Sequence, residues 1–120
     1  MDPVKKLKEY LENESNVVFA VMFGSEAKGT QRKDSDIDIG IYFTMSPEGI
    51  ELLQFTTRLS DLAGKDVDVA VLNTASAFLR HQAMKYRVPL IIKDYTIYRE
   101  FREKTIADYD EYKYISGLNG

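Results

Sequence analysis

The sequence of 120 residues contains no cysteine and a single histidine, His81. Without cysteine, neither a disulfide framework nor a thiolate metal site can form, and a lone histidine excludes a multi-histidine site. Any metal site in this chain must therefore be built from carboxylates. Carboxylate oxygens favour hard ions such as Mg²⁺ or Mn²⁺ over zinc.

The chain also lacks an excess of positive charge and any long apolar run. Its net charge is −3, so no basic field predicts direct binding of nucleic acid. No apolar run approaches the ~20 residues of a membrane span, and residues 1–6 lack the apolar segment of a secretion signal. We therefore expect one cytoplasmic domain over residues 1–120, without contact to a membrane.

Apolar periodicity and cap residues divide the chain into alternating helices and strands. Asp2-Pro3 and Ser46-Pro47 are typical of helix starts, and Gly64 is typical of a helix end. The expected fold class is α/β (α+β), with about four strands covered by helices and a long C-terminal helix. The expected strands are residues 17–23, 36–43, 66–72 and 89–92, and the expected helices are residues 3–13, 25–29, 47–63, 75–86 and 96–115.

Two short polar motifs stand at the ends of the first two expected strands. Gly24-Ser25 closes the first, and ten residues separate Ser25 from Asp36. Asp36 and Asp38 open the second strand, where alternate side chains share a face, so both carboxylates point the same way. Such a pair repels and loses hydration, and a divalent metal is the usual reason for it. The alternative of two solvated residues fits Asp38 poorly, because isoleucines flank it.

The third expected strand repeats this acidic alternation. Asp66 and Asp68 share one face of residues 66–72. Asp66 is at the strand's end, where an exposed carboxylate costs little, whereas Asp68 is expected to lie deeper, between valines. If the second and third strands are neighbours, we expect Asp68 to join Asp36 and Asp38.

The Gly-Ser turn also suits contact with a phosphate. Gly24 permits a positive φ and close approach of a ligand, and Ser25 offers a hydroxyl and an N–H at the start of a helical turn. An ordinary strand-to-helix turn is the alternative, and the acidic pair downstream gives the phosphate interpretation its weight. Ser35 could cap the entry to the second strand and orient Asp36.

Together these residues resemble a known family. Gly24-Ser25, ten intervening residues, Asp36-x-Asp38 and a third aspartate, Asp68, are similar to the motif of the DNA polymerase beta-like nucleotidyltransferase superfamily. The resemblance implies the nucleotidyltransferase fold, with a mixed sheet.

The length and the tail of the chain point to one branch of this superfamily. Lys93-Asp94, followed by a helix rich in tyrosine and arginine, resembles the minimal nucleotidyltransferase (MNT) domains. Many of these are antitoxins of HEPN–MNT toxin–antitoxin pairs. This resemblance implies that the partner is a HEPN-family toxin, a ribonuclease, and that the substrate nucleotide is ATP.

The resemblance also implies a mechanism. Asp36 and Asp38 would bind two Mg²⁺ ions that hold the triphosphate of ATP, and Asp68 would complete one metal site beside the acceptor hydroxyl. Gly24 and Ser25 would hold the β- and γ-phosphates, which leave as pyrophosphate. The implied acceptor is a tyrosine hydroxyl of the toxin, and transfer of AMP to it would silence the toxin, as in a type VII system.

The loop after the Gly-Ser dipeptide departs from the family pattern. Many relatives carry arginine at the next position, where this chain has Glu26. Lys28 keeps one basic residue in the loop, and we expect it to contact phosphate, with a solvated surface lysine as the alternative. Arg32 and Lys33 are expected to be exposed.

Two other functions stay open. A small-molecule nucleotidyltransferase similar to aminoglycoside-modifying enzymes would need substrate-binding elements for which the chain leaves little room. A non-catalytic antitoxin that only covers its toxin would not need three converging carboxylates.

Outside the site, His81 is expected to pack or lie at the surface, and Met22, Met45 and Met84 are expected to fill the core. Some of the tyrosines are expected to line a protein interface, among residues 95, 98, 109, 112 and 114.

Overall fold

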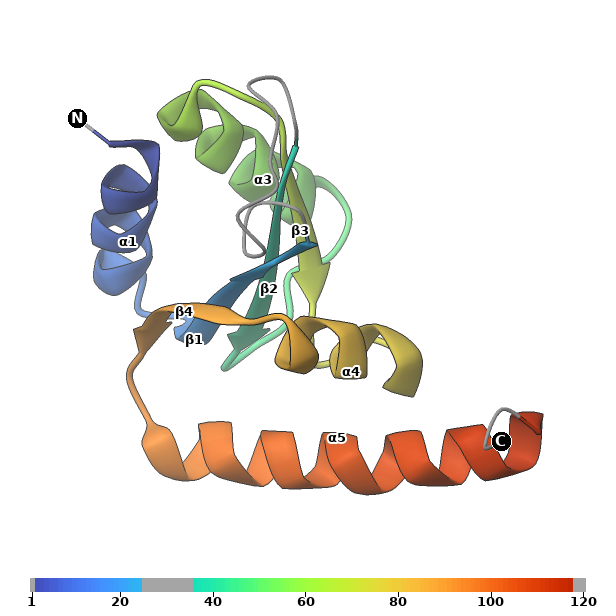
Figure 1. Ribbon diagram of the computed structural model, residues 1–120. Helices are drawn as coiled ribbons and strands as arrows, with labels where there is room; N and C mark the ends of the chain where they lie inside the picture. The colour runs from blue at the N-terminus through green and yellow to red at the C-terminus, as the bar shows by residue number, and fades with distance from the viewer. Residues whose placement is uncertain (1, 25–35, 118–120) are drawn as a thin grey trace.

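The computed structural model describes residues 2–24 and 36–117, along which helices alternate with strands (Figure 1). The predicted helical turn at 25–29 lies outside the described residues. The other expected elements are confirmed with shifts of a few residues. The helices are α1 (Pro3–Asn13), α3 (Ile50–Ala63), α4 (Ala77–Lys85) and α5 (Tyr95–Ser116), and the strands are β1 (Val17–Phe23), β2 (Ile37–Phe43), β3 (Val67–Val71) and β4 (Val88–Ile92).

The described strands form a four-stranded sheet in the order β3-β2-β1-β4. β1 pairs antiparallel with β2 and with β4, whereas β2 pairs parallel with β3. Parallel strands need a crossover connection, and α3 provides it between β2 and β3. The mixed sheet confirms the predicted fold class. β4, which contains Pro89, lies at an edge of the sheet, where a proline is tolerated.

The start of α3 differs from the prediction. The helix begins at Ile50, and its N-cap is Gly49, with a φ of 60° and no side-chain cap. Ser46 and Pro47 belong instead to the connection from β2, because the chain turns at a glycine that tolerates positive φ. The end of α3 is as predicted, at Gly64 with a left-handed φ of 73°.

Helices cover both faces of the sheet and enclose an apolar layer on each (Figure 1). On one face, Phe19 of β1 packs edge-on against Tyr98 and Phe101 of α5. Full burial of an apolar side chain contributes about 1.5–3 kcal/mol, and coverage of both faces explains the uninterrupted apolar run of β1. The face beneath α1 and α3 buries the alternate residues of β2, which are Ile37, Ile39, Ile41 and Phe43. None of the described helices has the length and apolar character needed to cross a bilayer.

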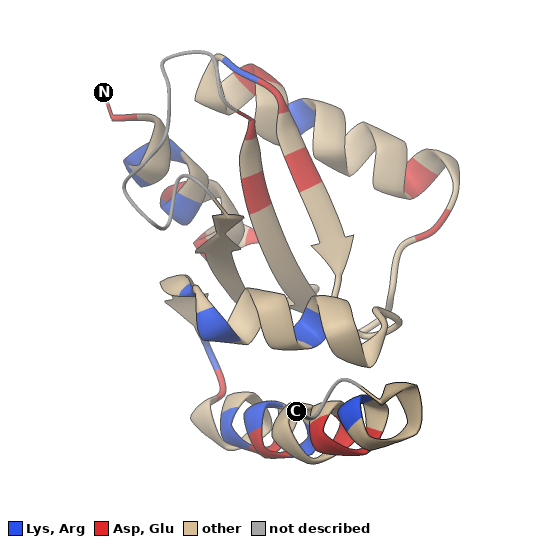
Figure 2. Ribbon diagram, turned by 45° about the vertical axis from the view of Figure 1, so that its right-hand side comes forward, with Lys and Arg blue, Asp and Glu red and all other residues tan. Residues whose placement is uncertain are grey.

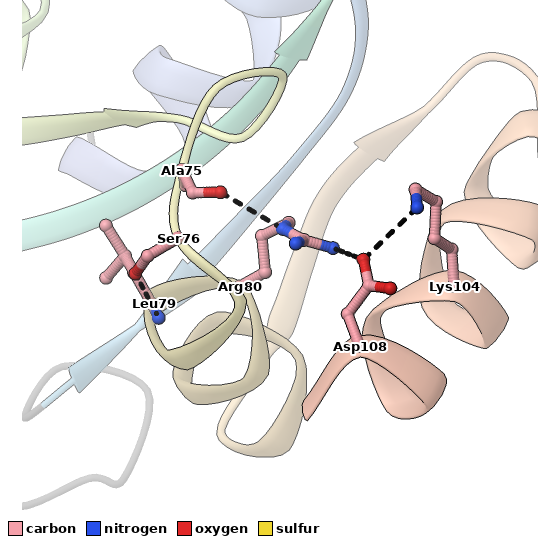
Figure 3. Close-up of polar contacts among 6 residues, drawn as sticks. All are labelled: Ala75, Ser76, Leu79, Arg80, Lys104 and Asp108. Carbon is pink, nitrogen blue, oxygen red and sulfur yellow. Dashed lines mark hydrogen bonds and ion pairs between the residues drawn. The ribbon is translucent and has the colours of Figure 1, made fainter. Parts of the chain in front are cut away.

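A polar cluster fastens α5 to α4 (Figure 3). Arg80 of α4 donates from Nη1 to Oδ2 of Asp108 at 3.0 Å, and from Nε to the carbonyl oxygen of Ala75 at 3.1 Å. Nζ of Lys104 lies 3.2 Å from the same oxygen of Asp108. Two cations on one carboxylate therefore connect α4, its preceding loop and the middle of α5.

Replacement of Asp108 by asparagine is expected to lower the melting temperature by a few degrees at pH 7. The hydrogen bonds from Arg80 and then Lys104 lower the pKa of Asp108. A carboxyl with a lowered folded-state pKa stabilises the fold above about pH 4, and this contribution disappears as the pH falls through the folded value. Thermal unfolding should therefore show a gap between wild type and D108N that narrows at about pH 3.

Asp110 offers a matched control on the same helix. Its carboxylate is exposed and lies 3.7 Å from Lys113, a separation at which an exposed pair contributes little. The D110N variant should have a smaller effect on the melting temperature than D108N at pH 7. A D108N gap of equal size at both pH values would contradict the role of charge in this cluster.

Candidate active site

The parallel pairing of β2 with β3 brings acidic residues side by side. Asp38 stands directly opposite Asp68 in the ladder, and Figure 2 shows acidic positions next to one another on the two strands. Neighbouring strands lie about 4.8 Å apart. Asp36 precedes Asp38 by two residues and lies on the same face. The condition on which the role of Asp68 depended is met, because β2 and β3 are neighbours, and it is Asp68, not Asp66, that is level with Asp38.

The aspartates lie on the face of the sheet toward α4 and α5. Ile37 and Ile39, on either side of Asp38, point into the core beneath α1 and α3. Tyr42, further along the aspartate face of β2, packs against Phe101 of α5. Helix α5 therefore covers this face near the end of β2. Near the start of β2 the face is open, and Asp36 and Asp68 are exposed there.

Asp38 is the most enclosed of the three carboxylates. It is half-buried, and its pKa is raised first by this burial, then by repulsion from Asp68 and from Asp36. The three carboxylates are thus close enough to affect one another, and a bound cation would relieve their repulsion. The expectation that Asp68 lies deep in its strand is wrong. The flanking valines point to the opposite face, and β3 is at the sheet's edge.

Gly24 directly follows β1 and lies against Asp38. Phe23, the last residue of β1, pairs with Asp38, and Gly24 has a φ of 76°, which glycine adopts without steric cost. A Cβ atom on Gly24 would collide with Oδ2 of Asp38. The positive φ therefore favours glycine, and any side chain here would displace the carboxylate of Asp38.

The carboxylates form an open acidic face. In residues 2–24 and 36–117, no three carboxylate or imidazole groups are gathered closely enough to hold a metal ion by themselves. Mg²⁺ in phosphate-transfer sites is commonly held by one or two carboxylates together with phosphate oxygens of the substrate, so an open face suits that ion. The other residues named from the sequence around this turn lie outside the described residues, and they are Ser25, Glu26, Lys28, Arg32, Lys33 and Ser35.

His81 is a packing residue, as predicted. Its ring stacks on Tyr109 of α5 with centroids 3.6 Å apart. Burial is the largest cause that lowers its pKa, followed by Lys85 and Lys113, so the ring is neutral at pH 7. Its Nδ1 atom has no hydrogen-bond partner among the described residues, and the aspartate face does not involve it.

The methionine prediction is confirmed in part, and the prediction that some of the tyrosines line a protein interface stays a prediction. Met22 and Met84 are buried, but Met45 is 77% exposed, so its assignment to the core is wrong. Met45 follows β2, where the side-chain amide of Asn16 binds its backbone N–H and carbonyl, each at 2.8 Å. Of the tyrosines, Tyr98 is buried, Tyr109 and Tyr112 are half-buried, and Tyr95 and Tyr114 are exposed.

The outer edge of β3 adjoins this site. The sequence did not indicate that β3 would be an edge strand. Strand order depends on contacts between segments far apart in the chain. The alternation in Val67–Val71 has the same appearance at an edge as inside a sheet.

Comparison with known proteins identifies the family. Residues 5–96 match the family described as polymerase beta, nucleotidyltransferase. The chain belongs to this nucleotidyltransferase family. The matched residues include all the described strands, and with them Gly24 and the three aspartates.

Individual relatives and solved structures show which members of this family the chain is similar to. This nucleotidyltransferase is 30% identical to the protein adenylyltransferase MntA of Shewanella oneidensis over 80 residues, which are 67% of this chain and 58% of MntA. Its structure is similar to a chain in a crystal structure of a toxin–antitoxin pair with AMP-PNP. That similarity has a TM-score of 0.86 and 26% identity, and covers 96% of this chain and 93% of the other.

A second structural neighbour comes from a complex of tri-AMPylated Shewanella oneidensis HEPN toxin with its MNT antitoxin. The TM-score is 0.77 and the identity 20%, with 96% of this chain and 93% of the other covered. At that identity the likeness concerns the fold alone. The nucleotidyltransferase fold predicted from the sequence motif is confirmed.

Proposed function

We propose that this nucleotidyltransferase transfers AMP from ATP to a tyrosine hydroxyl of a HEPN-family toxin and so neutralises it. The register that sets Asp38 opposite Asp68, with Asp36 on the same face, carries the proposal. Similarity to the adenylyltransferase MntA, and to chains from toxin–antitoxin complexes, supports it. Residues 1–120 would act as one minimal domain, in the cytoplasm.

The proposed reaction exchanges one phosphorus–oxygen bond for another. The tyrosine oxygen bonds to the α-phosphorus of ATP, and the bond from that phosphorus to the oxygen bridging to the β-phosphorus breaks. Pyrophosphate leaves, and the phenolic proton passes to water. Gly24 would let the triphosphate approach Asp38, Ser25 and Lys28 would bind its β- and γ-phosphates, and Ser35 would orient Asp36.

Asp36, Asp38 and Asp68 would hold Mg²⁺, or Mn²⁺ in its place. Their oxygens are ligands that hard cations prefer. Burial and then repulsion from Asp68 and Asp36 raise the pKa of Asp38, and such a cation would offset the repulsion. When bound, two such ions supply positive charge to the triphosphate and lower the pKa of the acceptor hydroxyl. Because β2 and β3 hold the carboxylates, the sheet would fix where these residues place the positive charge.

Mass spectrometry of the toxin tests the proposal. The cognate HEPN toxin is incubated with the protein, ATP and Mg²⁺, and a mass gain of one or more AMP units is expected. EDTA should prevent the gain, and calorimetry should show weaker ATP binding in its presence. A toxin of unchanged mass would overturn the proposed function, whereas ATP binding that EDTA does not affect would overturn the metal assignment alone.

A further inference from the structure

Among residues 2–24 and 36–117, several backbone groups on the outer edge of β3 have no hydrogen-bond partner. The carbonyl of Asp66 accepts from the N–H of Ile37, and the N–H of Leu72 donates to the carbonyl of Ile41, each at 2.9 Å. Residues 66, 68, 70 and 72 therefore direct their backbone groups toward β2. In a parallel ladder the alternate residues direct their backbone groups to the opposite side. The backbone groups of Val67, Val69 and Val71 therefore point outward, away from β2.

Part of this outer edge is already satisfied. The N–H of Val67 donates to Oγ of Ser60 at 2.9 Å, and the carbonyl of Val71 accepts from the N–H of Thr74 at 3.2 Å. Within the described part of the chain, the carbonyl of Val67, both groups of Val69 and the N–H of Val71 have no partner. These four groups form the pattern to which one short added strand pairs.

We propose that this edge binds an extended segment of the protein substrate as an added strand, which presents the acceptor tyrosine to the site. The inference rests on the proposed function. An added strand lies about 4.8 Å from β3, and a residue opposite Asp68 carries its side chain on the same face as Asp68. Asp38 on β2 is then two strand spacings from the added strand, about 10 Å. A tyrosine side chain on the added strand that leans across Asp68 points its hydroxyl toward Asp38.

A hollow beside the edge extends the same surface. Its volume is about 280 Å³. It is lined by Ser46, Pro47, Glu48, Gly49, Leu52, Val71 and Thr74. A side chain of the added strand beyond the tyrosine can enter this hollow, which would fix the direction and register of the segment.

Charge favours a foreign segment over a second copy of this chain. Asp68 lies at the centre of the edge and Asp66 just before it. Two β3 strands paired edge to edge would bring these carboxylates of both copies together on one face, and like charges opposite each other are destabilising. The edge therefore resists self-pairing while it remains open to a segment without acidic residues at those positions.

Backbone amide exchange tests the added strand directly. In ¹⁵N-labelled protein mixed with the HEPN toxin but no ATP, the amides of Val69 and Val71 should exchange at least tenfold more slowly than in the free chain. The amide of Val67 is an internal reference, because its bond to Ser60 already protects it. Unchanged exchange at Val69 and Val71 would overturn the proposal. Slower exchange at these amides without toxin, increasing with the concentration of this protein, would also overturn it, because it would show that two copies pair at this edge.

A proline variant provides the kinetic test. Val71→Pro removes an outward N–H without breaking a bond to β2, and Val71→Thr is the matched control that keeps the N–H. V71P should raise the KM for toxin at least tenfold and leave AMP-PNP binding unchanged, while V71T behaves as wild type. An unchanged KM in folded V71P would overturn the added strand. Failure of wild-type protein to modify the toxin would instead overturn the proposed function, and amide protection can still be measured in that case.

Discussion

Replacement of Asp36 and Asp38 together by alanine is expected to reduce AMP transfer by on the order of a thousandfold or more. The two carboxylates lie on one face of the sheet, and Asp38 stands opposite Asp68. The charge stabilisation proposed for the ions they hold is worth several kcal/mol. The measurement is the rate at which the toxin gains AMP, followed by mass spectrometry at saturating ATP and Mg²⁺.

The same double variant separates catalysis from binding alone. Its melting temperature should not fall, because burial and neighbouring carboxylates already disfavour the charged form of Asp38. Asp66→Ala is the matched control, since it removes a nearby charge that is not level with Asp38. If the folded double variant protects cells from toxin as well as wild type does, the protein neutralises by covering its toxin and not by modifying it.

Replacement of Gly24 by alanine is expected to reduce AMP transfer by about a hundredfold and to destabilise the fold by about 1–3 kcal/mol. The new Cβ would collide with the carboxylate of Asp38 and displace it from its place opposite Asp68. It would also force a residue with a side chain into a φ of 76°. Toxin modification and thermal unfolding measure the two effects separately.

Gly64 allows the two causes to be separated. Its φ of 73° is almost the same, but a Cβ there would meet no atom within 4 Å. Gly64→Ala should therefore lose stability to a similar extent and keep its rate of AMP transfer. Equal activity losses in the two variants would show that global destabilisation, and not displacement of Asp38, accounts for the effect at Gly24.

Much of the fold follows from local pattern. The apolar run of β1, the cap at Asp2 and the left-handed glycine after α3 are local signals, and they predicted element boundaries within a few residues. The start of α3 was mispredicted because Ser46-Pro47 is also compatible with a connection. Met45 was misplaced because its exposure depends on a contact with Asn16, which is distant in sequence.

The sequence predicted which residues form the acidic site, but not how deeply each of them is buried. Alternation along each strand placed Asp36 and Asp38 on one face, and Asp68 on the corresponding face of its own strand. Whether those faces meet depends on strand order and register, for which the sequence offered only a family resemblance. The exposure of Asp68 and the open outer edge of β3 both result from its position at the end of the sheet, which no local pattern encodes.

The crossover through α3 limits how this chain can vary in length. Only residues 64–66 separate α3 from β3, and loss or gain of one residue there would turn Asp68 to the opposite face of its strand. The connection from β2 to α3 spans residues 44–49, ends at a glycine, and can change length without altering the level of Asp68. Insertions between β2 and β3 should therefore be tolerated before α3 and excluded after it.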